Sequence, residues 1–436
     1  MSGPRHLSAS EAAALVRDVD TVGFPLGPGQ PGAFLHALGE RESYEDLQLF
    51  GALLVDLYEV FGRPGVRYFS GFYGPAERLL LQAGGSIEFV PADFRRFAPI
   101  LQSMRPRVMC TVAAPPDAAG YCSLSLHAGA SVDELHRAGH DDDRLLVVEV
   151  SEHFPRTLGI APTWPHAIHV DEIDVLVESD RTPFVLGEDE PDDVARAIAE
   201  SASQYIGDGA TLQTGIGAIP SAVASLLANG PGGDYGVHSE MFTTGLMHLH
   251  KAGKVSNLRK GGVFDGHSVT TFAAGSPELY EWLDGNEEVR FLPVDVVNSP
   301  ELIAKNRHMV TINGAVAVDV FGQVVADTVG GRQFSGIGGH EDFVSGPGLA
   351  LEDRSLVCMP ATARVGDELV SRLVPSFPAG AVITTPRHQL DVIITEFGAA
   401  ELQGRTVRQR AEALASVAHP QFRDALLEHA RTADLG

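Results

Sequence analysis

The stretch DGATLQTGIG at residues 208–217 joins an aspartate, a short apolar run and a G-x-G turn, directly before an apolar segment with helical periodicity. A matching stretch, DTVGFPLGPG, occupies residues 20–29. In each copy the aspartate, Asp208 or Asp20, stands seven residues before the first glycine of the G-x-G. Each copy also follows a predicted helix and leads from a predicted strand into another helix. The repeat indicates that the chain contains the same α/β unit twice, once in each half.

Short apolar runs alternate with helical segments on both sides of a polar, acidic stretch at residues 181–193. Strands are predicted at residues 47–54, 86–90, 107–113, 145–150 and 211–214, and helices at 31–40, 75–83, 93–104, 192–205 and 219–228. Apolar strands that alternate with helices are typical of mostly parallel sheets. We therefore predict two related open α/β domains, at residues 1–185 and 190–436, with a ligand crevice at the carboxyl ends of their strands.

The first copy also spells the dinucleotide-binding fingerprint G-x-G-x-x-G, with Gly27, Gly29 and Gly32. The acidic residue that should end the next strand is missing from the predicted strand at residues 47–54. Pro28 and Pro31 lack the backbone N–H groups that would face a pyrophosphate. We therefore favour a glycine turn that allows close packing of strand and helix over an NAD site.

Composition excludes several classes of protein. The chain of 436 residues carries 32 basic and 57 acidic side chains, and this net charge of −25 disfavours nucleic acid as a partner. Three cysteines without a CxxC pair indicate neither a disulfide framework nor a metal site. No apolar stretch reaches the length of a membrane span, so we expect a cytoplasmic protein that does not bind membranes.

The densest polar cluster is YGVHSEMFTTG at residues 235–245. Here Glu240 stands where a strand gives way to a helix, the position of a ligand crevice in an α/β sheet. Glu240 is either a nucleophile or a residue that caps the following helix, and His238 either orients it or is satisfied by the backbone. A G-x-S-x-G motif is absent, which disfavours a serine hydrolase, and H-x-E lacks the P-C-x-x-C of zinc deaminases.

A second glycine cluster, FSGIGGHEDFV at residues 334–344, contains Gly336, Gly338 and Gly339. Exposed backbone N–H groups in such a turn stabilise an oxyanion or allow a phosphate or pantetheine to approach the backbone.

Several long motifs, in the same order, resemble the acetyl-CoA hydrolase/transferase family of class I CoA-transferases, and within it the 4-hydroxybutyrate and butyrate:acetate CoA-transferases. The resemblance is strong from about residue 206 to residue 427 and weaker in the first half. The motifs are DGATLQTGIGAIPSAV, YGVHSEMFTTGL, PVDVVNSPELIAKN, INGAVAVDVFGQVVADTVGGRQFSGIGGHEDF, VITTPRHQLDVIITEFGAAELQGRTVRQRAEAL and AHPQFRDAL, with SGFYGP, PPDAAGYCSLS and EVSEHFPRTLG before them.

The resemblance implies a CoA-transferase fold of two related α/β domains and a set of site residues. The implied catalytic residues are Glu240, Gly338, Gly339 and Asn298. The implied CoA-binding residues are Gly215, Ile216, Gly217, Ala218, Ile219, Ala315, Gly336 and Arg372. Arg372 is either a partner for a CoA phosphate or a solvated surface residue.

The resemblance also implies the reaction, in which CoA moves from an acyl-CoA to a short carboxylic acid through a glutamyl-CoA thioester on Glu240. It implies no metal and no permanently bound cofactor, with coenzyme A entering as substrate, and a homodimer or larger homo-oligomer. Two alternatives remain, an acyl-CoA hydrolase and a non-catalytic CoA-binding protein. The chain has His340 where many relatives have glutamine and GAVAVD at residues 314–319 where many have SAIEVD, which leaves the acyl group open.

Overall fold

A parallel sheet organises the first half of the molecule. The computed structural model describes residues 3–188, 190–347 and 350–432, and its first sheet runs β1-β10-β8-β6-β2-β3-β4-β5 with every pairing parallel. The strands are β1 (Arg5–His6), β2 (Val19–Gly23), β3 (Asp46–Gly51), β4 (Val66–Ser70), β5 (Ile87–Phe89), β6 (Val108–Ala113), β8 (Leu145–Val150) and β10 (Val175–Glu178). The helices of this half are α1 (Ala9–Ala13), η1 (Gly27–Gly29), α2 (Gly32–Leu38), η2 (Glu59–Gly62), α3 (Pro75–Gln82), η3 (Phe94–Arg96), α4 (Phe97–Met104), α5 (Val132–Gly139) and η4 (Val170–Glu172).

Both faces of this sheet are buried, which explains its continuous apolar strands. Along β8, Leu145 and Val147 join one hydrophobic cluster, together with side chains of α1 and α2. The alternating residues Leu146 and Val148 join another, together with side chains of α4 and α5. Successive side chains of a strand point to opposite faces, so helices cover the sheet on both sides.

A second sheet, in the order β12-β11-β17-β22-β26-β27, organises the other half. Its strands are β11 (Thr211–Gln213), β12 (Gly236–Val237), β17 (Met309–Gly314), β22 (Arg354–Cys358), β26 (Val392–Thr395) and β27 (Gly398–Glu401), and the pairing of β27 with β26 is antiparallel. The helices are α6 (Asp193–Ser203), α7 (Ala218–Asn229), α8 (Thr244–Lys251), α9 (Pro277–Leu283), α10 (Val294–Val297), α11 (Pro300–Ile303), α12 (His340–Ser345), α13 (Val407–Ser416) and α14 (Pro420–Thr432). The predicted α/β class with parallel sheets is confirmed.

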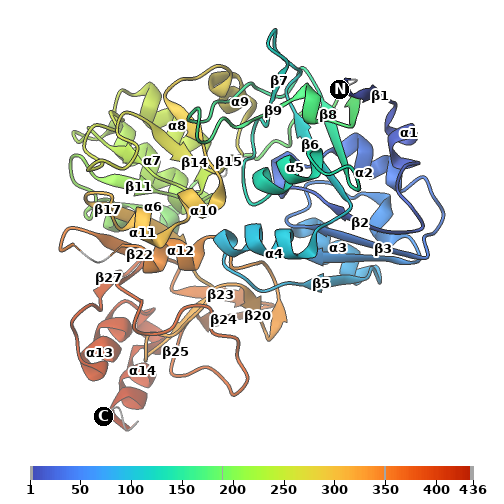
Figure 1. Cartoon of the computed structure of the whole chain (residues 1–436). Helices are drawn as coiled ribbons and strands as arrows, with labels where there is room; N and C mark the ends of the chain where they lie inside the picture. Colours follow the sequence, from blue (N-terminus) through green and yellow to red (C-terminus); the bar gives the residue numbers. More distant parts are fainter. Residues whose placement is uncertain (1–2, 189, 348–349, 433–436) are drawn as a thin grey trace.

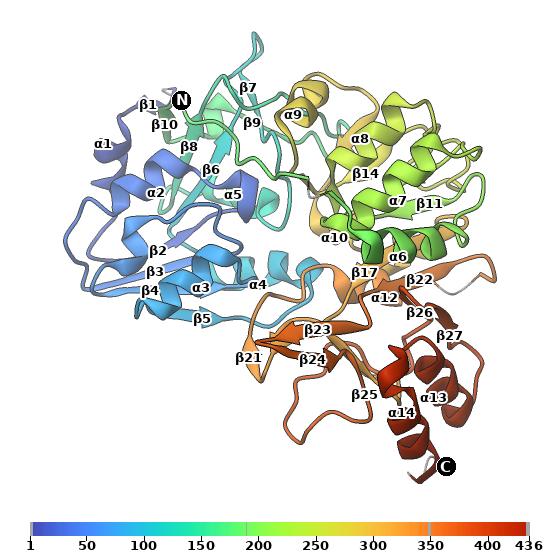
Figure 2. The same ribbon diagram turned by 180° about the vertical axis from the view of Figure 1, so that it is seen from behind.

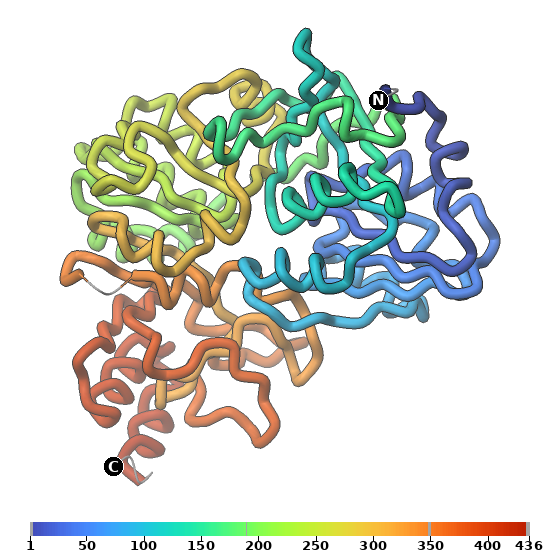
Figure 3. The backbone as a smooth tube through the Cα atoms, viewed as in Figure 1, coloured from blue at the N-terminus to red at the C-terminus, as the bar shows by residue number. Residues whose placement is uncertain are grey.

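Short strands complete the fold. They are β7 (Tyr121–Ser123), β9 (Ala167–His169), β13 (Met241–Phe242), β14 (Ser268–Thr270), β15 (Phe272–Ala273), β16 (Val289–Phe291), β18 (Ala317–Asp319), β19 (Val324–Val325), β20 (Thr328–Val329), β21 (Arg332–Gln333), β23 (Thr362–Val365), β24 (Glu368–Ser371) and β25 (Leu373–Val374). Figures 1 and 2 show the two halves side by side, with α4 reaching toward the second half near α12. The α13–α14 pair forms the far end of the molecule, and Figure 3 shows the two chain ends well apart.

Two predicted elements differ from the structure. The predicted strand at residues 47–54 ends at Gly51, because Leu53 adopts a left-handed backbone conformation (φ 47°) that turns the chain off the sheet. The predicted helix at residues 93–104 begins as the 3₁₀ turn η3 and becomes α-helical only at Phe97. Of the described helices, none combines the length and the apolar character needed to cross a bilayer.

The first glycine turn packs against protein. The amides of Gly27 and Gly29 donate to backbone carbonyl groups, that of Gly29 to Leu26 at 3.1 Å, so neither is free for a phosphate. A Cβ atom on Gly29 would lie 2.6 Å from Cβ of Pro25 and 2.9 Å from Cβ of His127. These contacts support the packing interpretation of this G-x-G-x-x-G.

Candidate active site

Glu240 lies between β12 and β13, on a loop whose backbone is fixed by the neighbouring chain. Its carbonyl oxygen accepts hydrogen bonds from the amides of Thr271 (3.0 Å) and Phe272 (3.2 Å) and from the hydroxyl of Thr270 (2.9 Å). The buried Ser239 hydroxyl donates to the Met241 carbonyl at 2.8 Å. The backbone of Glu240 is therefore held rigidly while its side chain faces a cavity.

The Glu240 carboxylate has one hydrogen-bond donor within the described ranges, the side-chain amide of Asn298 at the end of α10. Nδ2 of Asn298 donates to Oε2 of Glu240 at 2.5 Å. Burial raises the pKa of Glu240 to about 7, and the hydrogen bond from Asn298 opposes that rise. The structure thus brings together the two predicted catalytic side chains.

The Asn298 side chain also contacts a network of charged side chains. Nδ2 of Asn298 also donates to Oδ2 of Asp342 in α12 at 2.9 Å, and Asp342 forms an ion pair with Arg95 in η3. Arg95 in turn contacts Oδ2 of Asp93 at 3.0 Å. Sequence analysis missed Asp342 and Arg95, because 247 residues separate them and only the fold brings them into contact.

Gly338 and Gly339 of the second glycine cluster lie directly against Glu240, and we call them the glycine wall. A Cβ atom on Gly339 would lie 1.9 Å from Oε2 of Glu240, so only glycine leaves room for this carboxylate. Gly338 adopts a positive φ of 55°, and its carbonyl accepts the amide of Phe94 at 2.9 Å. Within residues 3–188, 190–347 and 350–432, the amides of Gly338 and Gly339 have no hydrogen-bond partner.

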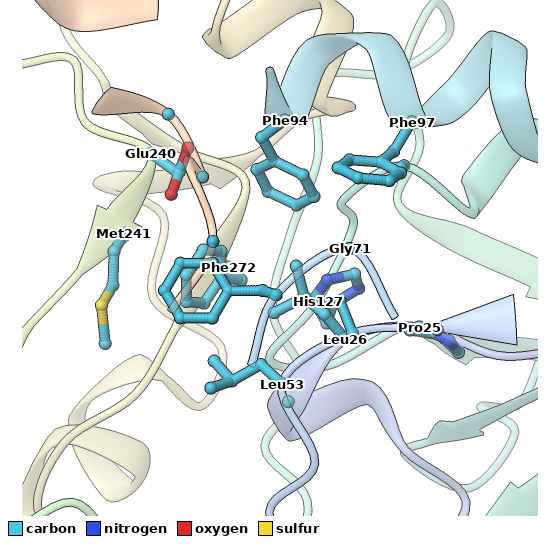
Figure 4. Close-up of a pocket in the computed structure, with 18 of the residues that line it drawn as sticks. Pro25, Leu26, Leu53, Gly71, Phe94, Phe97, His127, Glu240, Met241 and Phe272 are labelled. Atoms are coloured by element: carbon cyan, nitrogen blue, oxygen red, sulfur yellow. The ribbon is translucent and has the colours of Figure 1, made fainter. Parts of the chain in front are cut away.

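A cavity of about 810 Å³ extends from Glu240 into the space between the two halves. Figure 4 shows the Glu240 carboxylate at one side of the pocket, with Phe94 from the first half between it and Phe97, and with Phe272 and Met241 from the second half below it. Aromatic and aliphatic side chains form most of its wall, among them Phe24, Leu26, Phe50, Leu53, Phe69, Phe72, Ile100, Leu101 and Met104. Phe184 and Leu186, from the polar, acidic stretch at residues 181–193, also line this cavity.

A second cavity of about 430 Å³ adjoins the first at Gly215 and Ile216. Its wall includes the residues predicted to bind CoA at the start of α7, Gly215, Ile216, Gly217, Ala218 and Ile219. Gly217 adopts φ 107°, and a side chain on Gly215 or Gly217 would meet open space. This loop resembles the first glycine turn in sequence, but its glycines border open space, whereas Gly29 of the first turn packs against Pro25 and His127.

Comparisons with known proteins place the chain in a family. It is 35% identical to the 4-hydroxybutyrate coenzyme A transferase of Clostridium kluyveri, over 97% of this chain and 96% of that protein. The chain belongs to the acetyl-CoA hydrolase/transferase family. Residues 275–430 match the family model for the acetyl-CoA hydrolase/transferase C-terminal domain.

Two further relatives of this acetyl-CoA hydrolase/transferase family member cover almost its whole length. The succinyl-CoA:cyclohexane-1-carboxylate CoA transferase of Geobacter metallireducens is 34% identical over 97% of this chain and 94% of its own. The crystal structure of RipA from Yersinia pestis superposes with a TM-score of 0.90 at 30% identity, covering 99% of this chain and 98% of that one. The resemblance found in the sequence is thereby confirmed.

Of the other residues predicted to bind CoA in this family member, Gly336 lines the larger cavity. Ala315 and Arg372 line neither cavity. The guanidinium group of Arg372 donates from Nε to the Val316 carbonyl at 2.8 Å and also bonds the Ala315 carbonyl. These bonds give Arg372 a structural role between β18 and β25. A role for Arg372 or Ala315 in binding CoA stays a prediction.

His238 does not orient the Glu240 carboxylate through any hydrogen bond among the described residues. Its Nε2 donates to the Val297 carbonyl at 2.7 Å, and its Nδ1 accepts from the Asn306 side chain at 2.9 Å. Burial lowers the pKa of His238 to about 3, so the ring is neutral. Of the two interpretations of His238, the structure supports the second, in which other groups of the protein fill the hydrogen-bonding capacity of the ring.

Proposed function

We propose that this enzyme transfers CoA from an acyl-CoA to a free carboxylic acid through a glutamyl-CoA thioester on Glu240. One observation carries the proposal. The carboxylate of Glu240 lies at the wall of a large apolar cavity, close to Gly338, Gly339 and the Asn298 amide, and the backbone amides of both glycines are unpaired among the described residues. The proposed nucleophile, the amides proposed to bind an oxyanion and a hydrogen-bond donor to the carboxylate therefore lie next to one another.

The proposed reaction begins with attack of the Glu240 carboxylate on the thioester carbonyl. CoA leaves as a thiolate, and a mixed anhydride joins the acyl group to Glu240. The thiolate then attacks the glutamyl carbonyl, which releases the first acid and leaves the glutamyl-CoA thioester. The incoming acid attacks that thioester and the same steps run in reverse, so the thioester energy is retained and no step requires ATP.

The surroundings of Glu240 supply what a weak nucleophile needs. Burial removes water from the carboxylate, and its raised pKa of about 7 makes it more basic than an ordinary glutamate. The amides of Gly338 and Gly339 would stabilise the oxyanion of each tetrahedral intermediate, a contribution whose loss typically costs on the order of 10²-fold in rate. The glycine loop before α7 would bind the CoA chain and supply binding energy from a distance.

Transfer is favoured over hydrolysis by the cavity wall. Hydrolysis requires water at the glutamyl-CoA thioester, and Met241, Phe94 and Phe272 surround Glu240 with apolar groups. A purely CoA-binding role is disfavoured because the Glu240 carboxylate is held by Asn298 and Gly339 at the wall of the cavity. Transferase and hydrolase differ in one measurable respect, since a transferase releases free CoA only slowly when no second acid is present.

Intact-protein mass spectrometry after incubation with acetyl-CoA or butyryl-CoA tests the proposal. We expect a CoA adduct that maps to Glu240 and is absent from Glu240→Ala. Glu341→Gln is a matched control, because burial also raises the pKa of Glu341 to about 7 but its carboxylate contacts Thr385 and not the cavity. The absence of an adduct in a folded protein that binds CoA would overturn the covalent route.

We also propose that the protein is cytoplasmic, and that it assembles as a homodimer or larger homo-oligomer as the resemblance implies. Light scattering on the purified protein measures its mass directly, and a monomer of 46.4 kDa at micromolar concentration would contradict this part of the proposal.

A further inference from the structure

Two amide side chains lie where the two cavities meet. Gln213 is the last residue of β11, and Asn313 is the last but one of the neighbouring parallel strand β17. Asn313 lines both cavities, and Gln213 lines the larger one. Gly215 and Gly314 also line both cavities, and a side chain on either glycine would meet open space. The Gln213–Asn313 pair therefore borders an open junction between the two cavities.

The backbone fixes the orientation of the Gln213 amide. Oε1 of Gln213 accepts the backbone amide of Ile312 at 3.1 Å, so the oxygen lies on that side and the NH2 group on the other. Nε2 has no hydrogen-bond partner among the described residues, although Gln213 is only 5% exposed. Nε2 is not one of the polar atoms sealed from solvent, so it opens toward the cavity that Gln213 lines. Because buried polar groups are almost always paired, this free donor indicates a ligand.

Gln213 in turn orients the side chain of Asn313. Nδ2 of Asn313 donates to Oε1 of Gln213 at 3.4 Å, which leaves Oδ1 of Asn313 on the side away from that contact. Oδ1 also lacks a partner in the part of the chain that the structure describes, and it is not sealed from solvent. The two contacting side chains thus offer one donor and one acceptor. This combination complements a secondary amide, whose carbonyl accepts and whose N–H donates.

The charges around the junction favour a neutral ligand over an anion. Among the described residues, no lysine or arginine lines either cavity. Glu190 and Asp192 line the smaller cavity, so a phosphate there would lie beside two carboxylates. Oδ1 of Asn313 would likewise repel a carboxylate or a phosphate. The pair is therefore suited to an uncharged amide.

The junction lies close to Glu240. Thr214 follows Gln213, Ser239 precedes Glu240, and the Ser239 hydroxyl donates to the Thr214 carbonyl at 3.1 Å. In the parallel register of β11 and β12, Glu240 lies two residues beyond the position opposite Gln213. Strands about 4.8 Å apart that rise about 3.3 Å per residue place the backbones of Gln213 and Glu240 roughly 8 Å apart. In a CoA thioester, two methylene groups separate the sulfur from the first amide of the pantetheine arm, so this amide comes within reach of the pair.

We propose that Gln213 and Asn313 bind the amide of the pantetheine arm that lies nearest to the thioester. Nε2 of Gln213 donates to the carbonyl oxygen of that amide, and Oδ1 of Asn313 accepts its N–H. The inference rests on the proposed function, because it takes CoA as the molecule that reaches Glu240 through the junction. Neither residue is among the CoA-binding residues that the sequence predicts. The two hydrogen bonds set the position of the thioester carbonyl relative to Glu240, which is how contacts remote from the reacting atoms assist catalysis.

An acetyl-CoA analogue in which oxygen replaces the N–H of this amide tests the acceptor. In the wild type, Oδ1 of Asn313 would face an ester oxygen, and we expect the second-order rate constant of Glu240 adduct formation to fall on the order of tenfold. Asn313→Ala removes the acceptor, so the ratio of the two rate constants should move toward one. Asn229→Ala is the matched control and should keep the wild-type ratio, because its amide donates to the Ser225 carbonyl and lines neither cavity.

Gln213→Glu tests the donor. Glutamate keeps an oxygen for the Ile312 amide but places a second acceptor where Nε2 donates. We expect kcat/KM for acetyl-CoA to fall, whereas kcat/KM for the acceptor acid, which reacts when CoA is already attached, should be unchanged. A loss confined to the acid would assign the pair to the carboxylate of the acid and overturn the inference. A wild type that does not distinguish the two thioesters, or an Asn313→Ala variant that keeps the full wild-type ratio, would overturn it as well.

Failure of the proposed function has a different signature. If acetyl-CoA forms no Glu240 adduct, the covalent route is contradicted, and calorimetry with free CoA and its oxygen analogue measures the same preference without turnover. The wild type should then bind CoA more tightly than the analogue, and Asn313→Ala should reduce that difference. Equal affinities in the wild type would overturn the assignment of the Gln213–Asn313 pair.

Discussion

Gly339 shows how a single residue sets the position of the Glu240 carboxylate. A methyl group there would lie 1.9 Å from Oε2 of Glu240 and 2.6 Å from Nδ2 of Asn298. We expect Gly339→Ala to displace Glu240 and to slow formation of the CoA adduct by about 10²-fold, because misplacement by an ångström has costs of that order. Gly62→Ala is the control, since a side chain there meets open space. An unchanged rate in Gly339→Ala would contradict this view of the glycine wall.

The ionisation of Glu240 gives a second prediction at the scale of one residue. Only the carboxylate form attacks, and burial raises the pKa of Glu240 to about 7. The rate of adduct formation should therefore rise with pH up to about 7 and level off above it. The hydrogen bond from Asn298 lowers this pKa, so Asn298→Ala should move the midpoint to higher pH. Single-turnover mass spectrometry from pH 5.5 to pH 9 measures both profiles, and a flat wild-type profile would refute the assignment.

At the scale of elements, η3 from the first half and α12 from the second meet behind the active site. Their contact is the ion pair of Arg95 with the fully buried Asp342, which in turn accepts a hydrogen bond from Asn298. The amide of Phe94 in η3 also holds the Gly338 carbonyl. One short turn of the first half thus holds both the Gly338 backbone and, through Asp342, the Asn298 side chain that binds Glu240.

Removal of the Arg95 charge tests this contact between elements. Arg95→Met leaves Asp342 buried without its cation, and we expect the free energy of unfolding to fall by about 3–5 kcal/mol. Arg96→Met is the control, because the side chain of Arg96 is 66% exposed in its ion pair with Asp93, and such pairs contribute about 0–1 kcal/mol. Urea denaturation measures both variants. Equal effects would show that the ion pair of Arg95 with Asp342 does not support the site.

At the scale of the whole molecule, the active site belongs to neither half alone. Phe94 and Phe97 pack with Met241 and Phe272 in one hydrophobic cluster that crosses between the halves. We therefore expect a fragment of residues 190–436 to form no CoA adduct under conditions in which the full chain does. Circular dichroism establishes whether the fragment folds, which also tests the predicted domain boundaries. Adduct formation at the rate of the full chain would contradict the shared site.

The sequence by itself determined the α/β class, the repeated strand–turn–helix unit and Glu240 with its glycine wall. These are local features, since periodicity and turn residues act over a few positions and the motifs around Glu240, Asn298 and Gly339 are contiguous. Only the tertiary structure decided what the two glycine turns do. The same spacing yields a packed turn beside His127 in one half and an open loop before α7 in the other.

The tertiary structure also decided which side chains surround the carboxylate. Arg95 and Asp342 are 247 residues apart, and the aromatic wall of the cavity comes from both halves. Contacts of this kind depend on how the two halves pack together. No local pattern in the sequence shows that residues so far apart along the chain come into contact. The proposed nucleophile is therefore found in one short motif, whereas the size, charge and polar groups of the cavity beside it arise only when the two halves come together.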